Sequence, residues 1–241
     1  MQTSLYVGLS AQLALQKRME TVAHNVANAN TAGFRAEEVR FEELLSRHGD
    51  GGVAFAGAGG TFISREAGGM QRTGGAFDVA VKGEGWLAIA TPQGQAYTRD
   101  GRLQMTPEGE LRTLNGHAVL DVGGAPIQLD PAGGPPQIAA DGAITQNGRR
   151  TGVIGLFGLN ADAKLTRYEN SGVLSDPPGW PILDFSRNGV MQGYLEGANV
   201  NAVSEMSSLI AVSRAFDAVA NTLGATENTL NDGLRTLSGA S

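Results

Sequence analysis

The 241-residue sequence contains no cysteine. This absence excludes a disulfide framework, a thiolate metal site and a cysteine nucleophile. The three histidines, His24, His48 and His117, are too scattered for a metal-ligand pattern, and no carboxylates are paired at a spacing typical of a hydrolase. We therefore predict no catalytic, cofactor-binding or metal-binding residues.

Basic clusters and long apolar runs are also missing. The formal net charge is −6 and no run of Lys or Arg is longer than two residues, which argues against a nucleic-acid partner. No apolar run approaches the roughly 18 to 20 residues that span a bilayer, so we expect no transmembrane segment. Residues 1–15 lack a basic segment ahead of an apolar run. A cleaved secretory signal peptide is therefore not expected, and export would need another route.

Glycine is abundant but unevenly distributed. The 35 glycines are about twice the average usage of roughly 7%. They are sparse in residues 1–46, dense from 49 to 193 and sparse again from 199 to 237. The distribution indicates that the ends and the middle are built differently. Together with the periodic patterns described below, it predicts an α+β fold with a discontinuous, coiled-coil-like layer of N- and C-terminal helices and an inserted β-rich domain. We place the helical assembly domain at 1–46 plus 195–241, a Gly-rich linker at 47–72 and the β-rich middle domain at 73–194.

Apolar residues near the N-terminus follow a helical period. Leu15, Met19, Val22 and Val26 are spaced by four, three and four residues, which predicts an amphipathic helix between residues 4 and 28. The segment from Thr31 to Gly33 ends it, because glycine readily adopts the positive φ often needed at a helix terminus.

The C-terminal segment carries a heptad repeat that predicts a long, coiled-coil-like helix. Thr226 and Gly233 are its weak points, since they place a polar group and a missing side chain on the seam. The positions of the repeat are Leu209, Val212, Phe216, Val219, Leu223, Thr226, Leu230, Gly233 and Leu237.

The middle of the sequence is typical of short strands joined by tight turns. Phe77, Val79 and Val81 alternate with polar or small residues, and an apolar run begins at Trp86. Turn signals such as Pro92-Gln93-Gly94, Asn115-Gly116 and Asn147-Gly148 follow, so a meander of hairpins is expected.

The two helical stripes need a surface that covers them, and the simplest solution is that they pack together. This pair could be the core of an ordinary α+β domain, or it could expose apolar surface for assembly into an open helical filament. Asn25 and Asn28 share a helix face, where a buried amide could fix the register between subunits or simply cap the helix end. The candidate assembly residues are Leu15, Met19, Val22, Asn25, Val26, Asn28, Leu209, Val212, Phe216, Val219, Leu223 and Leu230.

Three motifs resemble those of the flagellar basal-body rod and hook protein family. The first, in residues 25–35, reads Asn-Val-Ala-Asn-Ala-Asn-Thr-Ala-Gly-Phe-Arg. The second comprises residues 73–86, from Thr-Gly-Gly-Ala-Phe to Gly-Glu-Gly-Trp, together with Tyr-Thr-Arg-Asp-Gly at 97–101. The third, in residues 193–201, is Gly-Tyr-Leu-Glu-Gly-Ala-Asn-Val-Asn. Within the family, the sequence looks most like a proximal rod protein.

The resemblance implies a structural, non-enzymatic subunit that polymerises through its terminal helices into the hollow shaft of the rod. It also implies passage through the flagellar type III export apparatus, residence in the periplasm-spanning rod, and contact with the distal and other proximal rod proteins. A distal rod or hook-type subunit of the same axial structure is the alternative within the family. A secreted adhesin or carbohydrate-acting protein is the alternative from another class.

Overall fold

A computed structural model describes residues 2–46 and 53–239 and has the expected α+β composition. The chain forms two compact units, and both are discontinuous in sequence. The first comprises Met1–Ala27, Glu37–Phe62 and Asn201–Ser241, and the second comprises Asn28–Ala36 and Ile63–Val200. Both predicted terminal helices therefore belong to the first unit.

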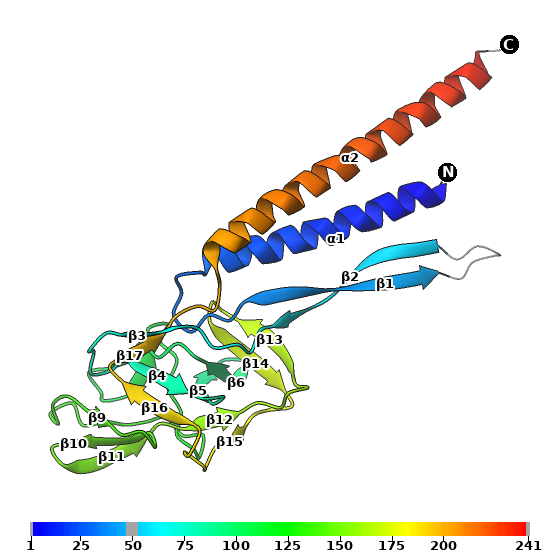
Figure 1. Ribbon diagram of the computed structural model, residues 1–241. Helices are drawn as coiled ribbons and strands as arrows, with labels where there is room; N and C mark the ends of the chain where they lie inside the picture. Colours follow the sequence, from blue (N-terminus) through cyan, green and yellow to red (C-terminus); the bar gives the residue numbers. More distant parts are fainter. Residues whose placement is uncertain (1, 47–52, 240–241) are drawn as a thin grey trace. The chain divides into compact units, whose positions relative to one another are not determined.

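The first unit contains helices α1 (Gln2–Ala27) and α2 (Ala202–Ser238), which lie side by side and run antiparallel (Figure 1). Val22 and Val212 are buried. Gly8 allows close packing, because a Cβ atom there would lie 2.5 Å from Cδ2 of Leu223. With 37 residues against 26, α2 is the longer helix and extends beyond α1 (Figure 1).

A two-stranded sheet completes the first unit. Strands β1 (Glu37–Ser46) and β2 (Val53–Ile63) pair with each other, and β1 contacts α1. Residues 53–63 were expected to lie in the Gly-rich linker at 47–72 but form β2 instead; residues 47–52 of that range lie outside the described part of the chain. The physical reason is that backbone groups make the hydrogen bonds of a strand, so small side chains do not prevent pairing.

The second unit is built around a six-stranded antiparallel sheet with strand order β13-β14-β6-β5-β12-β15. The turn Pro92-Gln93-Gly94, predicted from the sequence, joins β5 to β6. The strands are β5 (Trp86–Thr91), β6 (Gly94–Thr98), β12 (Leu156–Gly158), β13 (Lys164–Tyr168), β14 (Gly172–Asp176) and β15 (Trp180–Pro181).

Smaller sheets surround it, in the pairings β16-β4, β17-β3, β7-β8 and β11-β10-β9. The predicted Asn147-Gly148 turn joins β10 to β11, and both of its residues have positive φ, 49° and 74°. The strands are β3 (Met70–Arg72), β4 (Val79–Lys82), β7 (Leu103–Met105), β8 (Leu111–Thr113), β9 (Gln137–Ile138), β10 (Ala143–Gln146), β11 (Arg149–Val153), β16 (Gly189–Gln192) and β17 (Tyr194–Glu196).

Strand β5 lies between two hydrophobic cores. Leu87 packs in one core with Val79 and Val81, whereas Trp86 and Ala88 pack in the other. Successive side chains of a strand point to opposite faces, so a strand buried on both faces needs a continuous apolar run. This explains why the apolar run that begins at Trp86 does not alternate with polar residues.

Candidate assembly surface and the motif cluster

Helix α1 presents an exposed apolar stripe. Tyr6, Leu9 and Leu13 are 62%, 47% and 59% exposed. Their spacing of three and four residues places them on one face of the helix. A stripe of large exposed apolar side chains on one helix face is typical of a surface that another molecule covers.

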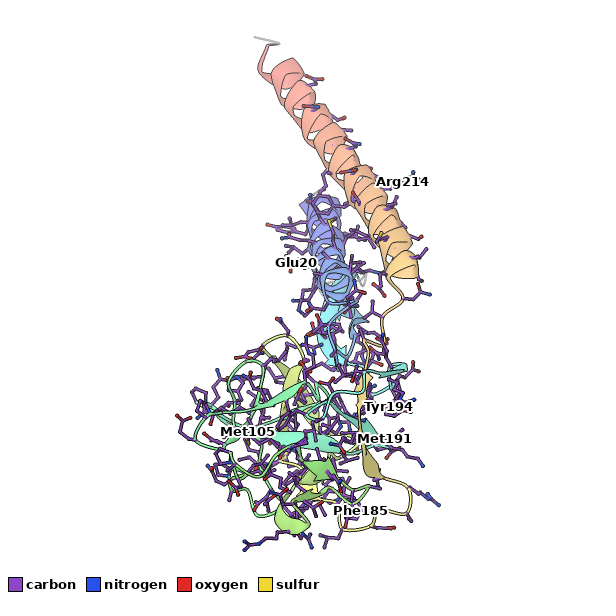
Figure 2. The ribbon with its side chains drawn as sticks, turned by 90° about the vertical axis from the view of Figure 1, so that its left-hand side faces the viewer. Glu20, Met105, Phe185, Met191, Tyr194 and Arg214 are labelled. Atoms are coloured by element: carbon purple, nitrogen blue, oxygen red, sulfur yellow. The ribbon has the colours of Figure 1, made fainter. Side chains whose placement is uncertain are left out.

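Helix α2 carries a second stripe with the same spacing. Val203, Met206 and Ile210 are 76%, 50% and 55% exposed. Each stripe is followed, further along the same face of its helix, by an exposed charged residue: Glu20 on α1 and Arg214 on α2, both labelled in Figure 2. The two stripes are named below the outer stripes.

The predicted seam, which is the stripe from Leu15 to Val26 on α1 and the heptad positions from Leu209 on α2, lies on the other side of each helix. At about 100° per residue, Leu15 lies opposite the α1 stripe and Val212 lies opposite the α2 stripe. Each helix is therefore apolar on two opposite faces. Among the predicted assembly residues on the two seams, Val22 and Val212 are buried, and Leu15, Met19, Val26, Leu209, Phe216, Val219 and Leu223 are half-buried; the side chain of Leu230 lies outside the described part.

The two predicted asparagines make hydrogen bonds within the chain. Asn25 is buried and binds both backbone groups of Glu37: its Nδ2 donates to the carbonyl oxygen and its Oδ1 accepts from the N–H, each at 2.9 Å. Asn28 follows the end of α1, and its Oδ1 accepts a 3.2 Å hydrogen bond from Oγ1 of Thr31. Asn25 thus fixes the start of β1, and Asn28 stabilises the turn after α1. A role between subunits stays a prediction.

The sequence motifs meet in a buried cluster of four side chains, named below the motif cluster. Glu196 accepts a hydrogen bond from Arg99 (Nη1 to Oε2, 3.0 Å) and forms an ion pair with Arg35 (Nη2 to Oε1, 2.6 Å). The guanidinium carbons of Arg35 and Arg99 lie 5.6 and 5.4 Å from the ring centre of Trp86. None of the four side chains is more than 3% exposed.

The two arginines of the cluster are held differently. Arg99 also donates to the carbonyl oxygens of Val81 and Gly83, at 3.0 and 2.6 Å. Arg35 is held by charge rather than by aligned hydrogen bonds, since its three guanidinium nitrogens have no hydrogen-bond acceptor despite the short contact with Glu196.

Burial also governs how readily the two guanidinium groups stay charged. It lowers the pKa of Arg35 to about 10; Glu196 acts in the opposite direction, and Arg99 adds to the lowering. Burial likewise lowers the pKa of Arg99, against the raising effects of Glu196 and Glu84. Glu196 is therefore the anion that keeps two buried cations in place.

Gly33 allows the first motif to reach this cluster. Its φ is +66°, and a Cβ atom there would lie 2.2 Å from the backbone carbon of Arg99 and the nitrogen of Asp100. No other residue type satisfies both constraints without strain. The three motifs contain Arg35, Arg99 and Glu196, but no sequence pattern predicted that these side chains would meet.

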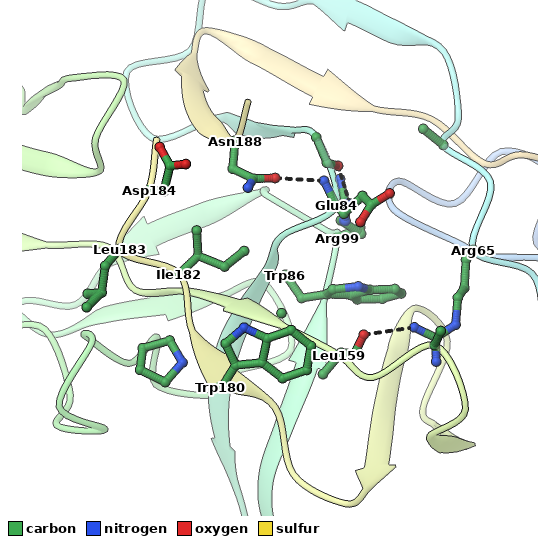
Figure 3. Close-up of a pocket in the computed structure, with 15 residues that line it drawn as sticks. Arg65, Glu84, Trp86, Arg99, Leu159, Trp180, Ile182, Leu183, Asp184 and Asn188 are labelled. Atoms are coloured by element: carbon green, nitrogen blue, oxygen red, sulfur yellow. Dashed lines mark hydrogen bonds between the residues drawn. The ribbon is translucent and has the colours of Figure 1, made fainter. Parts of the chain in front are cut away.

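A pocket of about 710 Å³ lies against the motif cluster (Figure 3). Trp86 and Arg99 form part of its wall, and Trp180 lines it from β15. Its polar groups hold the surrounding loops together: Arg65 donates to the carbonyl oxygen of Leu159, and Asn188 Oδ1 accepts from the N–H of Glu84.

Among the residues that the structure describes, no group of three or more His, Cys, Asp or Glu side chains is placed to hold a metal ion. No helix within 2–46 or 53–239 is long and apolar enough to cross a membrane. His117 instead forms an ion pair with Glu169, with Nε2 2.9 Å from Oε1.

Comparison with known proteins finds flagellar relatives that align over nearly the whole chain. Residues 5–35 match the model of the flagella basal body rod protein, 80–146 the D1 domain of the flagellar hook proteins FlgE/F/G, and 191–236 the C-terminal region of the flagellar basal body rod FlgEFG proteins. The flagellar basal-body rod protein FlgF of Mesorhizobium japonicum is 48% identical over 98% of both chains, and that of Rhizobium meliloti is 47% identical over the full length of both. The basal-body rod protein FlgG of Bacillus subtilis is 29% identical over 88% of this chain and 90% of its own.

The fold, the buried motif cluster and these relatives define a structural protein of the bacterial flagellum, not an enzyme. The chain belongs to the flagellar basal-body rod protein family, and within it is most like FlgF. It is a structural subunit of the basal-body rod.

Proposed function

We propose that the subunit polymerises with other rod proteins through α1 and α2, and that the outer stripes make the contacts between subunits. The observation that carries the proposal is that each helix is apolar on two opposite faces, of which only one is covered within the subunit. A helix that is apolar on more than one side is normally buried on more than one side. The neighbouring subunits of the rod supply the missing cover.

Different contact surfaces on the two helices suit an open polymer. If the α1 stripe of one subunit packs on the α2 region of the next, the contact is heterologous, and a heterologous contact that does not close on itself generates a helical filament. The exposed α1 stripe around Leu9 and the exposed α2 stripe around Ile210 support this arrangement.

The seam has a second role in this proposal. We infer that the heptad repeat forms a coiled-coil-like pair with α1 inside the subunit and continues into a neighbour where α2 extends beyond α1. Helices held mainly by packing are marginal alone, so the termini become fully ordered only as the subunit is incorporated. Assembly and the last step of folding are then coupled.

The family supports a path and a set of neighbours for this chain. We propose that it leaves the cytoplasm through the flagellar type III export apparatus without a cleaved signal peptide and enters the rod that spans the periplasm. Its partners are the distal rod protein and the other proximal rod proteins, with no nucleic acid involved. A distal or hook-type position on the same axial structure is the alternative.

The test is a pair of substitutions on consecutive residues of α2. Ile210→Asp places a charge in the outer stripe, where it cannot be buried unpaired, and should abolish rod incorporation and motility while the subunit stays folded. Ala211→Asp is the matched control, because Ala211 is also exposed but lies about 100° around the helix. Normal rods from the Ile210→Asp variant would contradict the proposal.

A third variant separates the seam from the outer stripe. Phe216 is half-buried on the seam, so Phe216→Asp should prevent incorporation and also lower the thermal stability of the helical unit in the isolated subunit. Ile210→Asp should leave that stability unchanged. The two variants would behave alike in the isolated subunit only if the two faces did not have separate roles.

A further inference from the structure

Residues 189–199, named here the strap, hold together parts of the second unit that are otherwise separate. The strap contains β16 and β17, which are the pairing partners of β4 and β3 in their two-stranded sheets. Val190 on β16 is buried in the core with Val79 and Val81 of β4. Among the described strands, β3 and β4 therefore gain their pairing partner only from the strap.

Two amides of the strap each join several segments. Gln192 Oε1 accepts a hydrogen bond from the N–H of Ile138 at 3.0 Å. Its amide nitrogen, Nε2, donates to the carbonyl oxygens of Ala76 and Pro136, both at 2.7 Å. Asn199 Oδ1 accepts from the N–H of Ala36 at 2.6 Å, and its Nδ2 donates to Ser64 Oγ at 3.1 Å.

The strap also holds residues 28–36, the segment that follows α1. The carbonyl oxygen of Glu196 accepts from the N–H of Gly33 at 2.8 Å, and the N–H of Asn199 donates to the carbonyl oxygen of Phe34 at 3.3 Å. Glu196 adds its ion pair with Arg35. Arg167 and Ser64 contact the same segment from outside the strap, so the strap supplies most but not all of its polar anchors.

The charge of Glu196 links the position of the strap to the burial of Arg35 and Arg99. Without it, Arg35 and Arg99 would lie buried over the same Trp86 ring with their shared anion removed. An uncompensated buried charge is strongly unfavourable, so the cluster cannot stay closed when the strap is open.

The strands of the six-stranded sheet pair without the strap, which shares only the core of Val190 with Leu87 of β5 and Leu156 of β12. All six of its strands lie between Trp86 and Pro181, and the core that contains Tyr97, Phe157 and Val173 includes no strap residue. Sub-global opening requires this arrangement, in which one set of contacts can break while another persists.

We propose that the strap and residues 28–36 form one cooperative element that closes last and opens first, while the six-stranded sheet stays folded. Closing the strap anchors, in a single step, the segment that follows α1 and the segment that precedes α2. If the subunit is exported N-terminus first, a point that rests on the proposed function, residues 28–36 lack most of their polar anchors until the strap has also emerged.

Native-state hydrogen exchange of the full chain in low denaturant tests this directly. Amides in 28–36, in β4 and in the strap should exchange through one shared opening, at a lower free energy than amides of β5, β6 and β14. Exchange of all these regions only through global unfolding would overturn the proposal. So would independent openings of the strap and of residues 28–36.

A single substitution provides a second test of the proposal. Glu196→Gln keeps the side-chain shape but removes the charge from the closed state, and should raise the population of the shared opening at least roughly a hundredfold. Because the closed state is the reference for both openings, exchange of β5, β6 and β14 through global unfolding should rise by the same factor, and the free-energy gap between the two sets of amides should stay unchanged. Glu108→Gln, at an exposed turn, should change nothing. Unchanged exchange in Glu196→Gln would overturn the proposal, and if that variant fails to fold, the wild-type measurement still decides. The wild-type and the variant measurements both use the isolated subunit, so their outcomes do not depend on whether the subunit polymerises.

Discussion

Arg35 and Glu196 form a buried ion pair, with 2.6 Å between Nη2 and Oε1, that joins the segment following α1 to the segment preceding α2. Neither side chain is more than 1% exposed. The basic residue that ends the first motif and the acidic residue inside the third motif are thus two halves of one contact. This gives both motifs a structural reason that does not involve catalysis.

The two halves of this pair should differ in their effect on stability. Glu196→Gln leaves two buried arginines without their anion and should cost about 3–5 kcal/mol in the free energy of unfolding. Arg35→Met leaves Glu196 paired with Arg99 and should cost less than about 2 kcal/mol. Urea denaturation followed by tryptophan fluorescence measures both. Equal costs, or a larger cost for Arg35→Met, would show that Glu196 is not the central charge.

Gly33 should be far less tolerant of substitution than another glycine with the same backbone conformation. Gly33 and Gly74 both have positive φ, 66° and 74°, so alanine at either should cost roughly 1–2 kcal/mol. At Gly33 the new Cβ would also collide with the backbone at Arg99, whereas at Gly74 it meets open space. Gly33→Ala should therefore lower the unfolding midpoint clearly more than Gly74→Ala. Similar midpoints would rule out the close approach.

Asn25 should stabilise the isolated subunit, apart from any role between subunits. Asn25→Ala removes both hydrogen bonds to the backbone of Glu37 and should cost about 1–3 kcal/mol. Asn30, in the same motif, is exposed, and Asn30→Ala should stay within about 0.5 kcal/mol of wild type. Thermal unfolding followed by far-UV circular dichroism distinguishes them. If Asn25→Ala impaired only rod assembly, the register role would be favoured instead.

The Glu169–His117 pair predicts a small pH effect. Burial acts to raise the pKa of Glu169, but hydrogen bonds from His117 and Asn115 and the charge of His117 outweigh it, so the pKa is below its ordinary value. A lowered folded-state pKa gives stability that is present above the unfolded-state value, about 4.3, and lost as the pH falls through the folded-state pKa.

A comparison of two proteins isolates this effect. Wild type should exceed Glu169→Gln in melting temperature near pH 6, and the difference should vanish near pH 3. Because Glu169 is 40% exposed, solvent screening keeps the effect below about 1 kcal/mol. A difference that grows toward acid would contradict the sign of the shift.

Local patterns predicted the helices and many turns. The 3.6-residue period from Leu15 to Val26 and the repeat from Leu209 correspond to α1 and α2, because helix formation depends on neighbours in sequence. Strand β2 was missed because its Gly and Ala residues carry no alternating apolar signal, and its strand character comes from pairing with β1.

The motif cluster and the outer stripes needed three-dimensional information. Arg35, Arg99 and Glu196 lie in separate segments, and no periodicity links them; their position inside three motifs was the only signal. Likewise Leu9 and Ile210 fit a helical period as well as the seam residues do. Only the packing of α1 on α2 shows which apolar face is covered within the subunit and which stays exposed.

A side-chain-resolution map of purified basal bodies tests the central claim most directly. The account predicts density for this chain in the rod, with Tyr6, Leu9 and Leu13 of α1 and Val203, Met206 and Ile210 of α2 buried against neighbouring subunits. The seam should pack within the subunit, except where α2 extends beyond α1 and meets a neighbour. A rod in which these side chains face solvent, or in which the chain is absent, would contradict it.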